Sequence, residues 1–143
     1  MAIQPGYAQA ILSGAKTVEF RKRALAPDVE TVLIYETAPT QRIVGLFRIV
    51  DTVRLSPRGL WRRFAEVGSI TRPEFMDYYA SRSTGVALVL GSVVSFEEPI
   101  PLSELRPRPA VPQSVSYISA EAVHQIELKL RSHDADRGEL LPA

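Results

Sequence analysis

The sequence contains no cysteine and only two histidines, and these shortages remove several kinds of site. Without cysteine the chain can form neither a disulfide nor a thiolate-bound metal centre. His124 and His133 stand nine residues apart, which matches no usual spacing of metal ligands. We therefore expect no metal and no other cofactor, and the sequence leaves only a carboxylate-bound magnesium ion open.

The sequence also lacks a membrane span and a secretory signal. No run approaches the roughly 18 consecutive apolar residues of a transmembrane helix. The first fourteen residues, MAIQPGYAQAILSG, have no basic start, and Pro5, Gly6 and Gln9 interrupt their apolar stretch. We therefore predict a cytoplasmic protein with no membrane partner, and nothing in the sequence indicates a protein partner.

Common catalytic motifs are missing as well: the chain has no P-loop, no dinucleotide fingerprint, no GxSxG and no HExxH. Positive charge is instead concentrated in two segments. Residues 16–23 (KTVEFRKR) hold four bases and one acid, and residues 54–63 (RLSPRGLWRR) hold four bases and no acid. Because the net charge of the chain is only +1, any basic surface is local to these segments; the alternative is two solvated charged stretches.

Length and composition fit one globular domain. The chain has 143 residues, of which 45% are hydrophobic and 23% are charged. A single core is commonly built from about 100–150 residues. We predict that residues 1–131 form the domain and that residues 132–143 form a flexible tail.

The pattern of apolar and turn-forming residues predicts four helices and five strands. Helices are expected over residues 5–13, 56–67, 72–79 and 120–132, and strands over 17–22, 31–36, 42–54, 85–96 and 114–118. Gly45 and Gly91 are expected at bends or bulges, and five prolines keep residues 97–112 a loop with one short turn. Few strands alternate with helices. The order therefore favours an α+β fold, a compact mixed β-barrel with short flanking helices and a helical insertion.

A cation, a carboxylate and a guanidinium, on Lys16, Glu19 and Arg21, follow the helix-ending Gly14 within eight residues. Strand alternation places Glu19 and Arg21 on one face, with Lys16 in the bend before the strand. Lysine and arginine suit phosphate, glutamate accepts hydrogen bonds from a base edge, and a lysine in a cleft can act as a base if its pKa is lowered. The alternative is a surface ion pair beside a solvated lysine.

Residues 14–23, GAKTVEFRKR, match the pattern GxKxxExR of ASCH domains, with Gly14, Lys16, Glu19 and Arg21 at its fixed positions. Further segments look similar in order to bacterial stand-alone members: VLIYETAP (32–39), IVGLF (43–47), EEPIPLSEL (97–105) and PQS (112–114). The chain thus resembles ASCH domains over residues 1–120. The resemblance implies a PUA-like β-barrel with a cleft at its mouth, where the three charged residues would face RNA, a nucleotide or a modified nucleoside.

The resemblance also limits the chemistry. ASCH relatives that act as N4-acetylcytidine amidohydrolases resemble this chain at Lys16 and Arg21 but have a threonine nucleophile where Glu19 stands. Without that hydroxyl the same covalent mechanism is unsuitable, because carboxylate attack on an amide would give a mixed anhydride.

Loops that should reach the same cleft supply further candidates. Tyr35, Glu36 and Thr37 end a strand on the mouth side, although Tyr35 also continues an apolar run that suits the core. Trp61 beside Arg62 could stack on a base or pack against its own helix. The remaining candidates are Arg23, at the basic end of the motif, and Gln113 and Ser114, after a proline-fixed loop.

Two functions from different classes fit these residues. The first is a binding module for RNA or a modified nucleoside, with Lys16 and Arg21 on phosphate or base and Glu19 on a base edge. The second is a hydrolase at the same cleft, a ribonuclease or a nucleoside amidohydrolase, with Lys16 as base and Glu19 as a second catalytic group. A domain that senses a small molecule is a third. Steep salt dependence would indicate phosphate contacts, whereas a nucleoside enzyme would show almost none.

Overall fold

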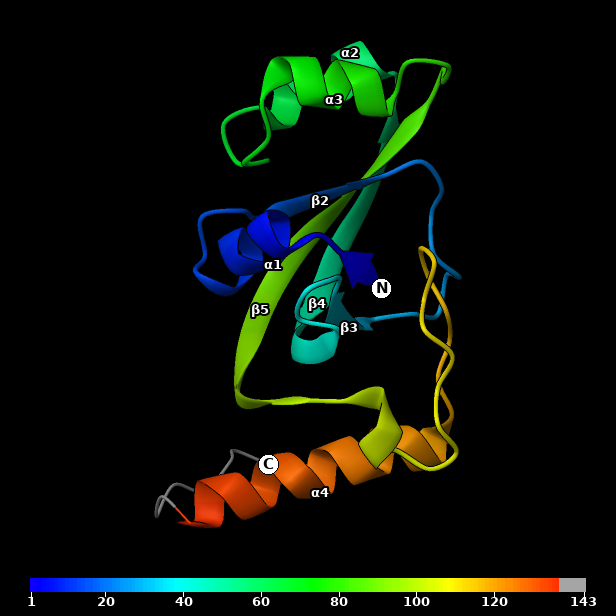
Figure 1. The fold of residues 1–143 in the computed structure, drawn as a ribbon. Helices are drawn as coiled ribbons and strands as arrows, with labels where there is room; N and C mark the ends of the chain where they lie inside the picture. Colours follow the sequence, from blue (N-terminus) through cyan, green and yellow to red (C-terminus); the bar gives the residue numbers. More distant parts are fainter. Residues whose placement is uncertain (137–143) are drawn as a thin grey trace.

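The computed structural model describes residues 1–136 (Figure 1). Its helices are α1 (Pro5–Leu12), α2 (Pro57–Phe64), α3 (Arg72–Tyr78) and α4 (Ala120–Asp136), with a short 3₁₀ helix, η1 (Leu102–Glu104). Its strands are β1 (Ala2–Ile3), β2 (Val18–Arg21), β3 (Thr31–Glu36), β4 (Arg42–Leu55) and β5 (Gly85–Ile100). No helix in this part of the chain is long and apolar enough to cross a membrane.

Local signals mark the helix ends. Ser56 and Thr71 cap α2 and α3, since their hydroxyls accept hydrogen bonds from the backbone amides of Gly59 and Glu74 at 3.1 Å and 3.3 Å. Gly14, just after α1, has a φ of 86°, which glycine adopts at little cost. All four predicted helices are therefore present, because their start and stop signals are local.

The five strands form one sheet in the order β1-β3-β4-β5-β2. Strands β1 and β3 are parallel, and the other neighbours are antiparallel. The predicted barrel is not confirmed: β1 and β2 are the two edges and do not pair with each other in the described chain, so the sheet is open.

The predicted strand at 114–118 is wrong. Within residues 1–136 this segment is joined to the sheet by a single backbone hydrogen bond, from the amide of Ala2 to the carbonyl of Ser114 at 2.8 Å. It therefore runs as an extended coil beside β1. The two-residue β1, which we did not predict, takes its place next to β3.

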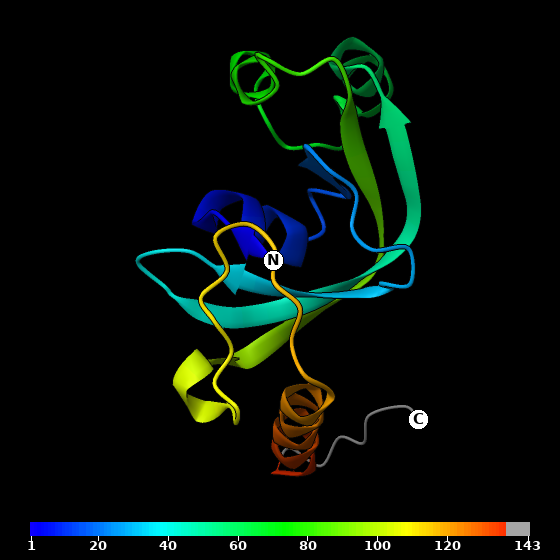
Figure 2. The same ribbon diagram turned by 90° about the vertical axis from the view of Figure 1, so that its right-hand side faces the viewer.

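Strands β4 and β5 are long and bent, and they carry α2 and α3 at one end (Figures 1 and 2). Their pairing shifts register at three places, the first between Ile43 and Gly45. A Cβ at Gly45 would lie 2.4 Å from the carbonyl oxygen of Val94, so the predicted irregularity there is confirmed. The bends curve the sheet around α1 (Figure 2).

Buried side chains form three clusters. The first packs α1 against the sheet and includes Ile11 and Phe47. The second includes Tyr35 and Ile126 and packs α4 onto the sheet. The third surrounds Phe75 under α2 and α3. The helical insertion thus has its own small core, which lies next to β2.

Helix α4 continues to Asp136, past Arg131, where we expected the domain to end and a flexible tail to begin. It is joined to the rest of the fold by an ion pair between Lys129 and Glu104 at 2.9 Å, and Nε2 of His133 lies 2.8 Å from a carboxylate oxygen of Glu97. Residues 137–143, the rest of the predicted tail, lie outside the described residues.

Candidate functional site

Lys16 lies in the bend between α1 and β2, as predicted, but its side chain is not solvated. Its backbone amide donates to the carbonyl of Ala10 in α1 at 2.9 Å. The amide of Thr17 donates to the carbonyl of Val67, in the helical insertion, at 3.0 Å. The bend is thus held between two elements, and the residue Lys16 is only 2% exposed.

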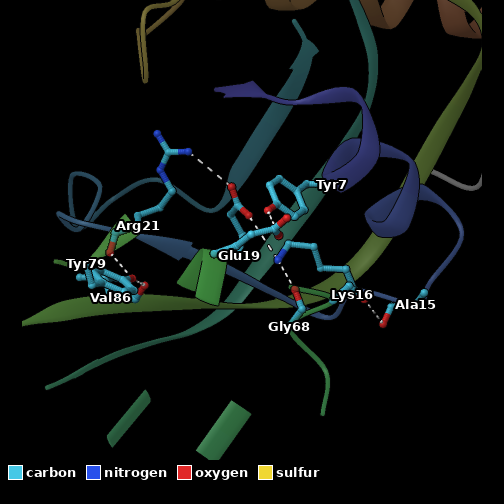
Figure 3. Close-up of polar contacts among 10 residues, drawn as sticks. Tyr7, Ala15, Lys16, Glu19, Arg21, Gly68, Tyr79 and Val86 are labelled. Atoms are coloured by element: carbon cyan, nitrogen blue, oxygen red, sulfur yellow. Dashed lines mark hydrogen bonds and ion pairs between the residues drawn. The ribbon is translucent and has the colours of Figure 1, made fainter. Parts of the chain in front are cut away.

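The Lys16 ammonium has a crowded environment (Figure 3). It donates a hydrogen bond to the carbonyl oxygen of Gly68 and lies 3.7 Å from a carboxylate oxygen of Glu19. It also lies 5.3 Å from the ring centroids of both Tyr7 and Phe20. Burial lowers the pKa of Lys16, and the charge of Glu19 opposes this shift. The lysine can therefore lose its proton at a lower pH than an exposed lysine.

Glu19 lies between the two cations. It is 6% exposed, and its second carboxylate oxygen lies 3.4 Å from a guanidinium nitrogen of Arg21. Burial raises the pKa of Glu19, while the charges of Lys16 and Arg21 act in the opposite direction. The predicted same-face pairing of Glu19 and Arg21 is confirmed, but the pair is buried rather than a surface ion pair.

Arg21 is the member of the cluster that reaches the surface. Its side chain is 14% exposed and donates a hydrogen bond to the hydroxyl of Ser114, 93 residues further along the chain. The backbone carbonyl of Ser114 is in turn held by Ala2. Ser114 is therefore the one predicted loop candidate that forms a hydrogen bond with the cluster within residues 1–136.

The other predicted candidates form no hydrogen bond or ion pair with Lys16, Glu19 or Arg21 in the part of the chain that the structure describes. Tyr35 is 6% exposed and belongs to the buried cluster under α4, which matches the core alternative. Trp61 packs against Phe75 with ring centroids 5.1 Å apart, so it has a packing role, but with the neighbouring helix α3 and not with its own helix. The rest lie outside the cluster: Arg23, Arg62 and Gln113 are exposed, and Thr37 is half-buried in the turn after β3.

Tyrosines that we did not predict surround the cluster. Tyr79 donates from its hydroxyl to the carbonyl of Arg21 at 2.7 Å. The ring centroid of Tyr78 lies 4.9 Å from the Lys22 ammonium. Tyr7 donates to Glu74 at 2.9 Å, and burial together with the Glu74 carboxylate raises the pKa of Tyr7 to about 12. The sequence showed them only as apolar positions of helices, because their polar partners are distant in the chain.

The cluster therefore combines two buried acid–base groups with an arginine at its outer end. One carboxylate between two cations leaves a net positive charge, which favours an anion at the surface end. Lys16 cannot contact a phosphate in the observed arrangement, because it is covered, whereas the Arg21 side chain is partly exposed. No group of three or more histidine, aspartate or glutamate side chains among residues 1–136 could hold a metal ion.

Comparison with known proteins shows consistent similarities. The family model of the ASCH domain matches residues 1–129. An ASCH domain-containing ribonuclease from Zymomonas mobilis is 27% identical over 133 residues, which cover 88% of this chain and 87% of that protein. The crystal structure of ASCH from Zymomonas mobilis has a TM-score of 0.83 at 27% identity and covers 90% of this chain and 92% of that chain. A mutant of that protein has the same TM-score at 26% identity, with 90% and 94% covered.

Proposed function

The chain belongs to the ASCH domain family, and on that premise we propose that it is a cytoplasmic protein that binds single-stranded RNA at Arg21 and cleaves it. The observation that carries the proposal is the buried Lys16–Glu19 pair, 3.7 Å apart, which ends in a guanidinium at the surface. Perturbed acid–base groups beside an anion-binding group are typical of catalytic sites. The similarity to a protein named as a ribonuclease supports RNA as the substrate.

The surface next to Arg21 suits a nucleic acid strand. Lys22 and Arg23 follow Arg21 directly, both are exposed, and Arg82 donates a hydrogen bond to the carbonyl of Lys22 at 2.9 Å. Tyr78, half-buried beside Lys22, offers an aromatic ring of the kind on which unpaired bases stack. We propose that the phosphates follow the basic residues and that one base stacks on Tyr78.

The proposed reaction is an attack by the RNA on its own backbone. Lys16 in its neutral form accepts the proton of a 2′-hydroxyl, whose oxygen bonds to the adjacent phosphorus as the bond from phosphorus to the 5′-oxygen breaks. A water molecule supplies the proton for the leaving 5′-oxygen, the Glu19 carboxylate stabilises the ammonium that forms on Lys16, and Arg21 offsets charge on the phosphate. The products are a 2′,3′-cyclic phosphate and a 5′-hydroxyl.

Access to Lys16 requires a movement. The hydrogen bond from Tyr7 to Glu74 joins α1 to α3 beside Lys16. The Lys16 ammonium also donates a hydrogen bond to the carbonyl oxygen of Gly68. We propose that RNA binding separates α1 from the helical insertion, because these contacts are few and the Tyr7–Glu74 bond is exposed.

A substrate with a single chemical change tests the reaction. We expect a fluorescent oligoribonucleotide to be cleaved, with a 2′,3′-cyclic phosphate detected by mass spectrometry. The same strand with 2′-deoxynucleotides throughout should bind but resist cleavage, because the attacking hydroxyl is missing. Cleavage of the deoxy strand would exclude this mechanism, and binding without cleavage of either strand would leave an RNA-binding module.

The number of phosphate contacts is the second testable feature. With Arg21, Lys22 and Arg23 each neutralising one phosphate, log K should fall with log salt at a slope of about −2 for single-stranded RNA. Arg23→Gln should make the slope shallower by about 0.7, whereas Arg48→Gln, at an exposed ion pair on β4, should not change it. Equal affinity at low and moderate salt would contradict the proposed contacts.

A further inference from the structure

A pocket separate from the Lys16 cluster lies between β3, residues 109–118 and α4. Its volume is about 440 Å³. Figure 2 shows the segment that contributes its outer wall, in yellow to orange, which rises from η1 to a turn near α1 and then returns to α4. The volume is within the range of pockets that hold small organic ligands, about 300–1,000 Å³.

The lining is largely aliphatic and is contributed by all three walls. Leu33 comes from β3, Val115 and Ile118 from the outer segment, and Val123 and Ile126 from α4. Val123 is 39% exposed although it lines the pocket. Apolar surface thus remains uncovered at the opening, and an apolar ligand body would remove it from water.

The charged side chains that line the pocket are all acidic, namely Asp28, Glu30 and Glu127. No lysine, arginine or histidine side chain is part of the described lining, although the chain contains more bases than acids. Met1 is also part of the lining, and burial lowers the pKa of its amino group to about 6, so it adds little positive charge at neutral pH. The pocket therefore favours a cation and repels phosphate.

Not all of this negative charge is neutralised. Glu30 lies 3.4 Å from the exposed Arg48, and Glu127 lies 3.9 Å from His124 on the same helix. Asp28 forms no ion pair within residues 1–136. A ligand cation at the opening could therefore pair with the carboxylates of Asp28 and Glu127, which no lysine or arginine among the described residues neutralises.

Tyr35 supplies a second observation that points to a ligand. It lines the pocket and is 6% exposed as a residue, and no described residue accepts from or donates to its hydroxyl. The hydroxyl oxygen itself is not fully buried, so it can bond to water or to a ligand in the pocket. At the outer wall, Tyr117 is 66% exposed, and its hydroxyl accepts from the amide of Ala26 at 3.1 Å. The Tyr35 hydroxyl is thus available for a hydrogen bond to a ligand, and the ring of Tyr117 is exposed at the outer wall.

We propose that this pocket binds a small organic amine in its protonated form. The apolar body lies against the aliphatic walls, and the nitrogen faces Asp28 and Glu127 at the opening, where the Tyr117 ring also favours a cation. The site is independent of the proposed RNA site, because its charge has the opposite sign and its residues do not include Lys16, Glu19 or Arg21.

Three probes of similar shape and different charge test the proposal. Benzylamine, benzyl alcohol and benzoate are titrated at pH 7 and constant ionic strength, and amide shifts are followed by NMR. Benzylamine should shift the amides of residues 115–118 and 123–127 and bind about ten-fold more tightly than benzoate. The affinity for a probe this small is expected to be in the millimolar range.

Two variants locate the site. Asp28→Asn combined with Glu127→Gln should weaken benzylamine about three-fold per carboxylate, as exposed charge pairs do, and leave benzyl alcohol unchanged. Val123→Arg should abolish benzylamine binding, whereas Leu128→Arg, at an exposed position of α4 outside the pocket, should not. Circular dichroism confirms that both arginine variants fold.

Three results would overturn the proposal. They are the absence of shifts at the pocket with benzylamine at about 50 mM, equal binding of benzylamine and benzoate, and unchanged benzylamine binding in Val123→Arg. Failure of RNA cleavage would not affect it, because the titration uses no RNA.

Discussion

Replacing Lys16 with methionine is expected to slow RNA cleavage about 10²-fold or more, the usual contribution of a general base. Methionine keeps the length of the buried side chain and its contacts with the rings of Tyr7 and Phe20, but it cannot accept a proton. We choose it over alanine because Lys16 is 2% exposed, so that truncation would also leave a cavity. Single-turnover cleavage of a labelled RNA measures the effect.

The control for this variant is Lys129→Met, which removes an exposed lysine of α4 far from the cluster in sequence. Its cleavage rate should equal that of the parent. RNA affinity should change little in Lys16→Met, because Arg21 and its neighbours remain. A Lys16→Met protein that cleaves like the parent would remove Lys16 from the mechanism.

The pH dependence of cleavage gives an independent test of the same role. A lysine base is active when neutral, so the cleavage rate should rise with pH. Because burial lowers the pKa of Lys16 from its ordinary 10.5, this rise should be complete at a lower pH than for an exposed lysine. The residual cleavage by Lys16→Met should not show this rise with pH. A parent cleavage rate that falls as Lys16 loses its proton would contradict the role of Lys16 as the base.

Replacing Glu19 with alanine is expected to lower the free energy of unfolding by about 3–5 kcal/mol, the usual cost of removing one partner of a buried charge pair. The ammonium of Lys16 would then be buried with a carbonyl and two aromatic rings but no carboxylate. Glu19→Gln should cost less, since its amide oxygen can still accept a hydrogen bond. Urea denaturation followed by circular dichroism measures both.

Two further variants test whether the loss of stability comes from the buried charge of Lys16 or from the removal of any paired glutamate. Glu30→Ala breaks an exposed pair with Arg48 and should cost less than about 1 kcal/mol. Lys16→Met combined with Glu19→Leu removes both charges of the buried pair and should recover much of the lost stability, although cleavage should remain as slow as in Lys16→Met or slower. If Glu19→Ala unfolds at the same urea concentration as Glu30→Ala, the carboxylate does not compensate Lys16.

The motif and most of the elements could be predicted without the structure because their signals are local. Caps at Ser56 and Thr71, the glycine after α1 and the alternation along β2 each involve residues within a few positions of one another. The same alternation correctly paired Glu19 with Arg21. The four-position motif together with the ordered segments that follow it was sufficient to identify the family.

The environment of these residues was decided by contacts between distant parts of the chain. The sequence placed Lys16 in a bend without fixing the direction of its side chain. In the structure the carbonyl of Gly68, 52 residues away, accepts a hydrogen bond from it, and Arg21 meets Ser114 after 93 residues. Periodicity predicts which side of an element is buried but not which element covers it, and it does not report whether the edges of a sheet meet. The open sheet, the burial of the Lys16–Glu19 pair and the acidic pocket therefore follow only from the tertiary structure.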